Sequence, residues 1–379
     1  MIFAKRVLDV PPSATFKYAA MAKKEGIINL TIGRTNFNTP EVIREAAKKA
    51  LDEGKVHYTP SKGIPELREK IAQRHTNAGL KDIDSEKVIV SMGGKMILFE
   101  AIMAMIDAGD KVAIADPSWV SYDSMIKLAG GETVWLPTKP EKGFIPDEDY
   151  FEALDRSGAK MVIVNSPSNP TGAVYPESVL REITRIAEAN DMWMISDEIY
   201  EKIIFEGEAF SPGSIYDKVI TTNCFSKEFG MTGWRIGWAV CPDFEVIDKM
   251  NLIQQQSASN AVSFAQWGAL AGFTPEAEAA RDEMVEEMRK RRDYCMERME
   301  EINAVCMKPN GAFYLFPYFE GQNDVDLANS LLEAGVGTVP GSPFGPKGRG
   351  CLRMSYGSAG IEDLGKAFDR MVTVKGVGK

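Results

Sequence analysis

The sequence predicts an α/β protein with a large, mostly parallel sheet sandwiched by helices and a smaller α+β unit beside it. Two observations lead to this fold class. Between residues 87 and 240, apolar runs of strand length alternate with helix-length segments, which is typical of a parallel sheet covered on both faces. Beyond a long charged segment that begins at residue 274, this alternation stops, and the change indicates a second unit.

The segment before the sheet is expected to form an arm and two helices of the larger unit. Residues 1–40 form the arm, which is irregular apart from one short helix and one short strand. Thr39 and Pro40 are typical of the N-cap and first position of a helix, and Gly54 ends that helix. The elements expected here are helices at 16–25, 40–53 and 64–77 and a strand at 28–32.

Six strand-length apolar runs define the sheet. They lie at 87–92, 111–115, 161–165, 192–195, 219–225 and 236–240. Helices are expected at 95–106 and at 176–189, where the apolar residues of the second segment fall on one face. Strands that alternate with helices in this way predict parallel strands joined by helical connections.

A long charged helix marks the start of the smaller unit. Thr274 and Pro275 again match an N-cap and a first helical position, and the helix is expected to reach about residue 302. The elements expected after it are strands at 313–319, 335–340 and 351–356 and a final helix from residue 361. We therefore expect a large domain at 41–284 and a small domain built from 1–40 and 285–379.

The composition excludes several classes of function. The 379 residues carry 44 Lys and Arg against 54 Asp and Glu, a net charge of −10, which argues against a nucleic-acid partner. The sequence has two histidines, His57 and His75, which are few for a zinc site or a Ser–His–Asp triad. No metal is therefore expected. Five scattered cysteines, no signal-peptide core and no membrane-length apolar stretch predict a cytoplasmic protein without membrane contact.

Polar residues follow the predicted strands at the edge where open α/β sheets bind their ligands. After the first strand, Gly93, Gly94 and Lys95 begin a helix, whose free N–H groups can hold a phosphate. Taken alone, such a glycine pair more often only makes a tight bend. Trp119 follows the second strand, where its indole could stack on a planar ring, although core packing is the commoner role.

The next two strand ends carry an amide, a carboxylate and a phenol. Asn169, in NPTG, could bind a phenolic oxygen or could simply form an Asn–Pro turn. Asp197 could pair with a protonated pyridine nitrogen, and a helix N-cap is nearly as plausible for it. Tyr200 could donate to a ring oxygen or be a half-buried aromatic residue.

Lys227 follows the fifth strand, and Arg235 lies eight residues later. A lysine amine can form a Schiff base with an aldehyde cofactor, and a guanidinium can grip its phosphate, although most lysines and arginines are solvated surface charges. Arg353 interrupts an apolar predicted strand, which is unusual unless a carboxylate of the protein or of an α-amino acid pairs with it. Together these residues supply every contact that pyridoxal phosphate requires.

With these motifs in place, the chain resembles the fold-type I pyridoxal-phosphate enzymes of the class I/II aminotransferase family. SPSNPTGAVY, SDEIYE, SKEFGMTGWRIGW and CLRMSY carry the resemblance, which covers nearly the whole chain. It implies that Lys227 forms the Schiff base and moves the proton, and that Asp197 and Tyr200 complete the catalytic set. The cofactor contacts that it implies are Gly93, Gly94, Lys95, Trp119, Asn169, Asp197, Tyr200, Ser226, Lys227 and Arg235, with Tyr58 reaching the partner subunit's phosphate in a homodimer with shared active sites.

Within the family, the chain is similar to the bacterial and archaeal aspartate aminotransferases. This similarity implies ping-pong transfer of an amino group from L-aspartate or L-glutamate to a 2-oxo acid. Lys95 is then expected to reach the substrate's distal carboxylate, although a phosphate-side or solvated lysine remains the alternative. The other implied substrate contacts are Arg353 and Gly33 at the α-carboxylate, with Trp119, Asn169, Ser13 and Thr15 nearby.

One departure from the family pattern concerns the substrate. The family commonly reads G-E-P-D-F-x-T-P where this chain has GRTNFNTP, so two acidic positions are lost and Arg34 is gained. Arg34 is either a surface residue or a group that changes which acidic substrate fits. A prephenate or aromatic amino-acid aminotransferase is therefore the alternative, and a non-catalytic cofactor-binding regulator is a further one. A nicotinamide dehydrogenase would need GxGxxG, which GGKMIL does not provide.

Overall fold

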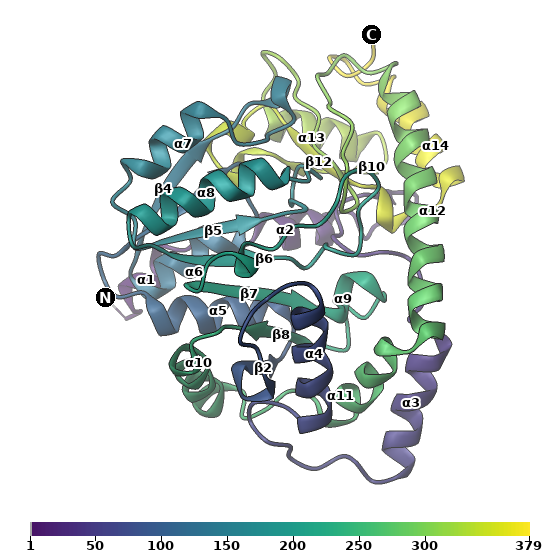
Figure 1. Ribbon diagram of the computed structural model, residues 1–379. Helices are drawn as coiled ribbons and strands as arrows, with labels where there is room; N and C mark the ends of the chain where they lie inside the picture. The colour runs from purple at the N-terminus through teal and green to yellow at the C-terminus, as the bar shows by residue number, and fades with distance from the viewer. Residues whose placement is uncertain (1) are drawn as a thin grey trace.

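A seven-stranded sheet forms the centre of the larger unit in the computed structural model, which describes residues 2–379 (Figure 1). The strand order is β2-β8-β7-β6-β5-β3-β4. All neighbours from β4 to β7 are parallel, and β8 is antiparallel to both of its neighbours. The predicted, mostly parallel sheet is therefore confirmed. The strands are β2 (Val88–Ser91), β3 (Lys111–Asp116), β4 (Glu132–Pro137), β5 (Met161–Asn165), β6 (Trp193–Asp197), β7 (Val219–Cys224) and β8 (Gly237–Val240).

Both faces of this sheet are covered by helices. In β5, Met161 and Ile163 pack into the core on one face, whereas Val162 and Val164 pack into the core on the other. A strand buried on both faces reads as a continuous apolar run, which is why the sequence predicted it. The first face carries α5 (Gly94–Met105), α6 (Ser121–Ala129) and α10 (Phe244–Ser257), and the second carries α7 (Glu148–Asp155) and α8 (Glu177–Ala189).

A third group of helices packs around the β2–β8 end of the sheet. It consists of α3 (Glu41–Asp52), α4 (Pro65–Asn77) and α11 (Ser263–Leu270). The prediction that Thr39 caps α3 was wrong, because Pro40 occupies the N-cap and no side chain caps the helix. The Thr39 hydroxyl instead donates a hydrogen bond to the Gly230 carbonyl at 3.3 Å, so a distant loop takes the group that the local pattern assigned to the helix.

The smaller unit is α+β, as predicted. One antiparallel sheet has the order β11-β12-β9, and β1 pairs in parallel with β10. Because β1 lies in the N-terminal arm, the arm and the C-terminal part of the chain share one core. The boundary near residue 284 stays a prediction. The elements are α1 (Lys5–Leu8), α2 (Ala14–Met21), β1 (Ile28–Asn29), β9 (Tyr314–Leu315), α13 (Asp324–Glu333), β10 (Val336–Gly337), β11 (Val339–Pro340), β12 (Leu352–Ser355) and α14 (Ile361–Met371).

The long helix α12 (Pro275–Met299) runs along one side of the molecule from α3 to α14 and contacts both (Figure 1). Its predicted N-cap is confirmed, because the Thr274 hydroxyl accepts a hydrogen bond from the Ala277 N–H at 3.4 Å. The helix therefore connects the two units, and none of the helices among residues 2–379 is long and apolar enough to cross a membrane.

One strand and several helices were not predicted from the sequence. The edge strand β4, with the sequence ETVWLP, has mostly half-buried residues, so it lacks the continuous apolar run that marked the other strands. The helices α6, α7, α10, α11 and α13 were also not predicted. The expected helix at 16–25 lies at 14–21 instead, and the expected strand at 28–32 is limited to 28–29.

Candidate active site

A cleft of about 470 Å³ lies where the sheet meets the smaller unit, at the carboxyl ends of the parallel strands. It is lined by residues that lie far apart in the chain and were predicted to act together. The predicted residues that line it are Thr15, Gly33, Gly94, Lys95, Trp119, Asn169, Tyr200, Ser226, Lys227, Arg235 and Arg353. Gly93, Asp197, Ser13 and Tyr58 are not among the lining residues.

Lys227 lies on the single helical turn α9 (Phe225–Glu228), directly after β7. Its ammonium group donates a hydrogen bond to the Gly33 carbonyl at 2.6 Å. The same nitrogen lies 5.8 Å from the ring centres of both Tyr200 and Phe313. The amine is half-buried, faces the cleft and has no carboxylate paired with it in the described structure, so it can reach a ligand held there.

Asp197 ends β6 and is almost completely buried. It accepts hydrogen bonds from the Tyr122 hydroxyl and from the Ile199 N–H. Burial raises the pKa of Asp197 to about 6, although the bond from Tyr122 and the charge of Lys227 counteract the rise. A carboxylate this deeply buried without a bonded cation favours a cationic ring nitrogen as its partner.

Tyr122 was missed by the sequence analysis. It lies on α6, an element that was not predicted, and its ring packs edge-on against Trp119 with 5.3 Å between ring centres. One signal in the sequence is its position three residues after Trp119; the two residues belong to one turn, in which the Tyr122 N–H donates to the Trp119 carbonyl at 3.1 Å.

Arg235 packs against the glycine pair that begins α5. A side chain at Gly93 would place its Cβ 2.6 Å from an Arg235 guanidinium nitrogen, and one at Gly237 would lie 2.4 Å from the Gly94 nitrogen. The guanidinium is held by the carbonyls of Met92 and Thr232 at 3.1 and 2.9 Å. A cation and the free N–H groups of a helix start therefore meet at one place, which fits a phosphate.

Lys95 follows this glycine pair and faces the aromatic wall of the cleft. Its ammonium nitrogen lies 4.9 Å from the ring centre of Trp119 and 5.5 Å from that of Phe16. Burial, followed by the charges of Arg235 and Lys227, lowers the pKa of Lys95. An anionic ligand group would relieve both effects. Nearby, the hydroxyls of Ser13 and Thr15 bond each other at 2.9 Å.

Arg353 projects from β12 and is buried. It donates to the Asn169 side-chain oxygen at 3.2 Å and to the Thr31 carbonyl at 2.6 Å, while its Nε has no partner. Burial lowers the pKa of Arg353. A buried guanidinium with an unused donor and no carboxylate partner is suited to bind one from a ligand.

Tyr314 is a second residue that the sequence analysis missed. Its hydroxyl lies 2.8 Å from the Tyr200 hydroxyl, and its ring lies 4.8 Å from the Arg353 guanidinium. A Cβ at Gly33 would lie 2.6 Å from the same hydroxyl. Gly33 therefore leaves the space that Tyr314 fills, and no local pattern in the sequence indicates this.

The charge of the cleft is one-sided. Arg34, Lys95, Lys227, Arg235 and Arg353 line it, and no Asp or Glu is among its lining residues in the described part of the chain. Tyr58 lies elsewhere on the surface and is 90 % exposed, so its predicted contact with a partner subunit stays a prediction. The residues predicted to bind the cofactor fit pyridoxal phosphate, because an amine and a phosphate cradle line one cleft and an unpaired carboxylate, Asp197, is buried at the end of a strand of the same sheet.

Comparisons with known proteins agree with this arrangement. Residues 25–370 match the family model described as aminotransferase class I and II. The chain is 41 % identical to the aspartate/prephenate aminotransferase of Thermus thermophilus, with 98 % of each chain covered, and 37 % identical to aromatic-amino-acid aminotransferase 2 of Thermococcus litoralis, with 99 % and 98 % covered. Its fold matches that of Thermus thermophilus aspartate aminotransferase with maleate at a TM-score of 0.92, with 42 % identity and 98 % of each chain covered.

Proposed function

The chain belongs to the class I and II aminotransferase family, and on this premise we propose that it transfers the amino group of an acidic amino acid to a 2-oxo acid in a ping-pong reaction. It is an aminotransferase by family. The identity of its substrates, the use of pyridoxal 5′-phosphate and the roles of individual residues are the proposed parts. The cytoplasmic location expected from the sequence also stays a prediction.

The residues of the cleft fit pyridoxal phosphate. When bound, this group supplies an aldehyde that takes up an amino group and a ring that withdraws electrons from the substrate. Lys227 would hold the aldehyde end, and Arg235 with the Gly94 helix start would hold the phosphate. Asp197 would pair with the ring nitrogen, and Trp119 would stack on the ring.

The protein's own groups then divide the remaining work. The Lys227 amine is placed to accept and return the proton at the substrate's Cα, since it faces the cleft and is anchored by the Gly33 carbonyl. The Tyr200 hydroxyl, held by Tyr314, and the Asn169 amide would donate hydrogen bonds to the ring oxygen. Because Asp197 is buried, water would be excluded from its contact with the ring nitrogen.

The single observation that carries the substrate proposal is the excess of cations in the cleft. Among residues 2–379, five cations and no acidic side chain line it, and the cofactor accounts for Lys227 and Arg235. Arg353 then binds the α-carboxylate, which leaves Lys95 and Arg34 for a second carboxylate. The names of the similar enzymes from Thermus thermophilus include aspartate, which supports this choice.

A second candidate substrate class is prephenate or an aromatic amino acid. It is favoured by the aromatic wall that Phe16 and Trp119 form around Lys95, and two similar enzymes have prephenate or aromatic amino acids in their names. A homodimer with Tyr58 at the partner subunit's phosphate is also proposed, since Tyr58 is 90 % exposed and does not face the cleft of its own chain.

The test is an absorbance spectrum of the purified protein loaded with pyridoxal phosphate, taken before and after addition of L-aspartate. We expect a visible band that L-aspartate removes and that 2-oxoglutarate restores. A band that responds to prephenate or aromatic amino acids, but not to L-aspartate, would favour the second candidate. Absence of any band after loading would contradict the proposed cofactor.

A further inference from the structure

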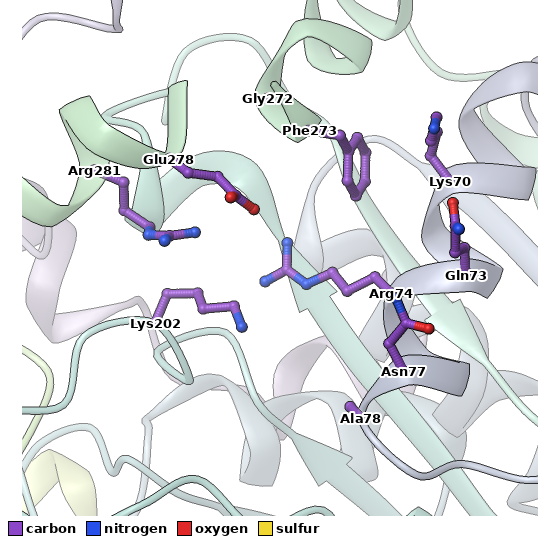
Figure 2. A pocket seen from close by; sticks show the side chains of 10 residues that line it. All are labelled: Lys70, Gln73, Arg74, Asn77, Ala78, Lys202, Gly272, Phe273, Glu278 and Arg281. Atoms are coloured by element: carbon purple, nitrogen blue, oxygen red, sulfur yellow. The ribbon is translucent and has the colours of Figure 1, made fainter. Parts of the chain in front are cut away.

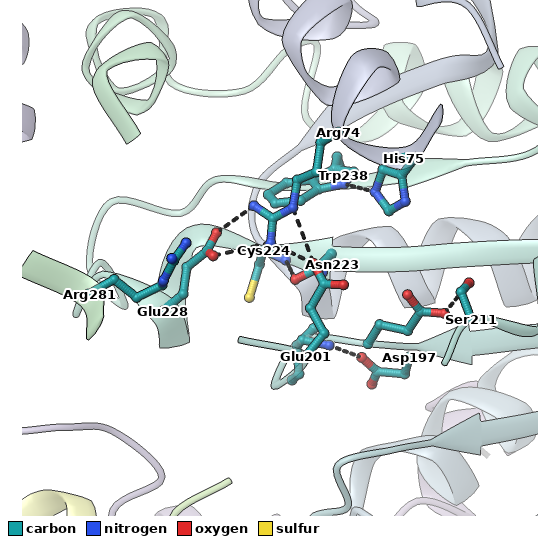
Figure 3. A network of polar contacts seen from close by, with 12 residues as sticks. Arg74, His75, Asp197, Glu201, Ser211, Asn223, Cys224, Glu228, Trp238 and Arg281 are labelled. Carbon is teal, nitrogen blue, oxygen red and sulfur yellow. Dashed lines mark hydrogen bonds and ion pairs between the residues drawn. The ribbon is translucent and has the colours of Figure 1, made fainter. Parts of the chain in front are cut away.

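A buried guanidinium outside the cleft joins two residues that directly follow proposed active-site residues. Arg74, near the end of α4, bonds Glu201 through Nε at 3.1 Å and Nη2 at 2.5 Å, and bonds Glu228 through Nη1 at 2.9 Å and Nη2 at 3.1 Å (Figure 3). The Glu228 carboxylate is bound through both of its oxygens, whereas Nε and Nη2 both donate to one oxygen of Glu201. The rigid plane of the guanidinium therefore fixes the positions of the two carboxylates relative to each other.

The two glutamates occupy equivalent places in the backbone. Glu201 directly follows Tyr200, and Glu228 directly follows Lys227. Asn223 on β7 adds a further bond to Glu201 at 2.9 Å. One side chain therefore holds the backbone turn that carries the amine and the turn that carries the phenol, from the side opposite to the cleft.

We propose that Arg74 is a positioning residue that sets Lys227 and Tyr200 relative to each other through Glu228 and Glu201. This inference rests on the proposed function. The residue itself does not line the cleft, so its contribution is to the alignment of Lys227 and Tyr200, which do.

The charge state of the network supports a fixed geometry. Burial alone would lower the pKa of Arg74, but the charges of Glu228 and Glu201 raise it above its ordinary value. Burial would raise the pKa of Glu201, but chiefly the charge of Arg74 lowers it to about 2. All three side chains are nearly excluded from solvent, with exposed fractions of 14, 13 and 3 % for Arg74, Glu201 and Glu228, so screening by water is weak.

Aromatic packing holds the plane of the guanidinium. Its central carbon lies 5.2 Å from the ring centre of Trp238. The Trp238 Nε1–H donates to His75 Nε2 at 2.9 Å, and burial lowers the pKa of His75 to about 4. His75 thus stays neutral and holds the Trp238 indole in place, and the indole in turn holds the Arg74 guanidinium.

An open approach leads to Arg74 from outside. The small exposed part of Arg74 lines a cavity of about 480 Å³ that is separate from the cleft and is also lined by Lys202, Glu278 and Arg281 (Figure 2). Truncation of Arg74 to alanine therefore leaves a hole next to two buried carboxylates that a small cation can enter from this cavity.

The test compares Arg74→Ala, Arg74→Lys and the control Arg68→Ala in the cofactor-loaded enzyme. Arg68 lies on the same helix, is also buried and pairs with the Ser85 carbonyl and Glu86, away from the cleft.

For Arg74→Ala we expect kcat per loaded site to fall by about tenfold to a hundredfold, because the reacting groups are misplaced. KM for L-aspartate should stay within about twofold, because Arg353 and Lys95 are untouched. The lysine variant should be intermediate, and the control should keep its kcat.

Two further readouts separate positioning from stability. The rate at which the cofactor-free protein forms a visible band with added pyridoxal phosphate should fall with kcat in Arg74→Ala. Guanidinium chloride at millimolar concentrations should restore part of both quantities in this variant, whereas urea at the same concentrations should not. Should Arg74→Ala fail to fold, Glu228→Gln keeps the shape of the network and removes one charge, and the same loss of kcat and band-formation rate is expected.

Wild-type kcat per loaded site and wild-type band-formation rate in Arg74→Ala, or in Glu228→Gln if the former is unfolded, would overturn the inference, even if the melting temperature drops. That outcome leaves the proposed function intact. A wild-type protein that forms no band and transfers no amino group would instead remove the proposed function itself.

Discussion

The ammonium nitrogen of Lys227 lies 2.6 Å from the carbonyl oxygen of Gly33, although 194 residues separate the two in the chain. Lys227 lies just after a strand of the large sheet, and Gly33 lies after the strand β1 that pairs with the C-terminal part of the chain. The contact therefore joins the two units at the reacting amine. It also fixes where the amine is held before a ligand arrives.

Replacement of Lys227 by alanine should lower turnover by at least about a thousandfold, because the attachment point and the proton carrier are lost together. The cofactor should still bind without a covalent bond, through Arg235 and Asp197. Gel filtration followed by an absorbance spectrum measures its retention. Replacement of the exposed Lys48 serves as the control, and near-normal turnover in Lys227→Ala would refute the proposed role.

The Asp197→Asn variant should lose at least about a hundredfold in kcat, because it removes a buried charge from the electron-withdrawing ring. Its shape and its bond from Tyr122 can be kept by the amide. Tyr122→Phe removes only that bond and should have a smaller effect. Steady-state kinetics with L-aspartate test this order, and equal activity of Asp197→Asn and wild type would contradict it.

The Lys95→Ala variant should lose activity mainly with dicarboxylic substrates. A bond between a lysine and a carboxylate contributes about 1.5–3 kcal/mol, which predicts a fall in kcat/KM for L-aspartate of roughly tenfold to 150-fold. The measurement compares L-aspartate with an apolar amino acid. An equal loss on both substrates would mean that Lys95 serves the cofactor rather than the distal carboxylate.

Arg34 is expected to affect which acidic substrate is preferred. It lines the cleft beside Gly33 and replaces an acidic position of the family pattern. In Arg34→Ala, the ratio of kcat/KM for L-glutamate to that for L-aspartate should change by several-fold, since one of the two free cations of the cleft is removed. An unchanged ratio would identify Arg34 as a solvated charge.

Glu100 predicts a pH dependence of stability. It is completely buried on α5, where the Ser91 hydroxyl bonds one oxygen at 2.8 Å and the other oxygen has no partner. Burial raises the pKa of Glu100 to about 8. The folded state then binds a proton that the unfolded state loses above its ordinary pKa, so this residue makes stability fall as the pH rises from about 4.5 to 8.

The Glu100→Gln variant should not show the loss of stability that Glu100 causes as the pH rises. Its free energy of unfolding should exceed that of the wild type by a few kcal/mol at pH 8, on the order set by the shift in pKa, and the difference should shrink toward pH 5. Urea unfolding at several pH values measures it. The exposed Glu69→Gln is the control, and a constant difference across the pH range would contradict the assignment.

The buried strands of the sheet were predictable because each one is a local apolar run, and candidate ligand-binding residues follow most of them. Parallel strands bring their carboxyl ends to one edge, so Lys95, Trp119, Asn169 and Lys227 could be placed in one cleft from the sequence. Edge elements such as β4 were not predicted, because their residues are partly buried and form no continuous apolar run.

The buried strands of the sheet and several of the residues that line the cleft could be inferred from the sequence, since these depend on apolar runs and on the polar residues that follow the strands. The sequence did not indicate that Tyr122 bonds Asp197, that Tyr314 bonds Tyr200, or that Arg74 joins Glu201 to Glu228. The partners in these contacts come from elements far apart in the chain. Their pairing depends on how the helices and strands pack against one another, and the local spacing of residues in the sequence does not encode it.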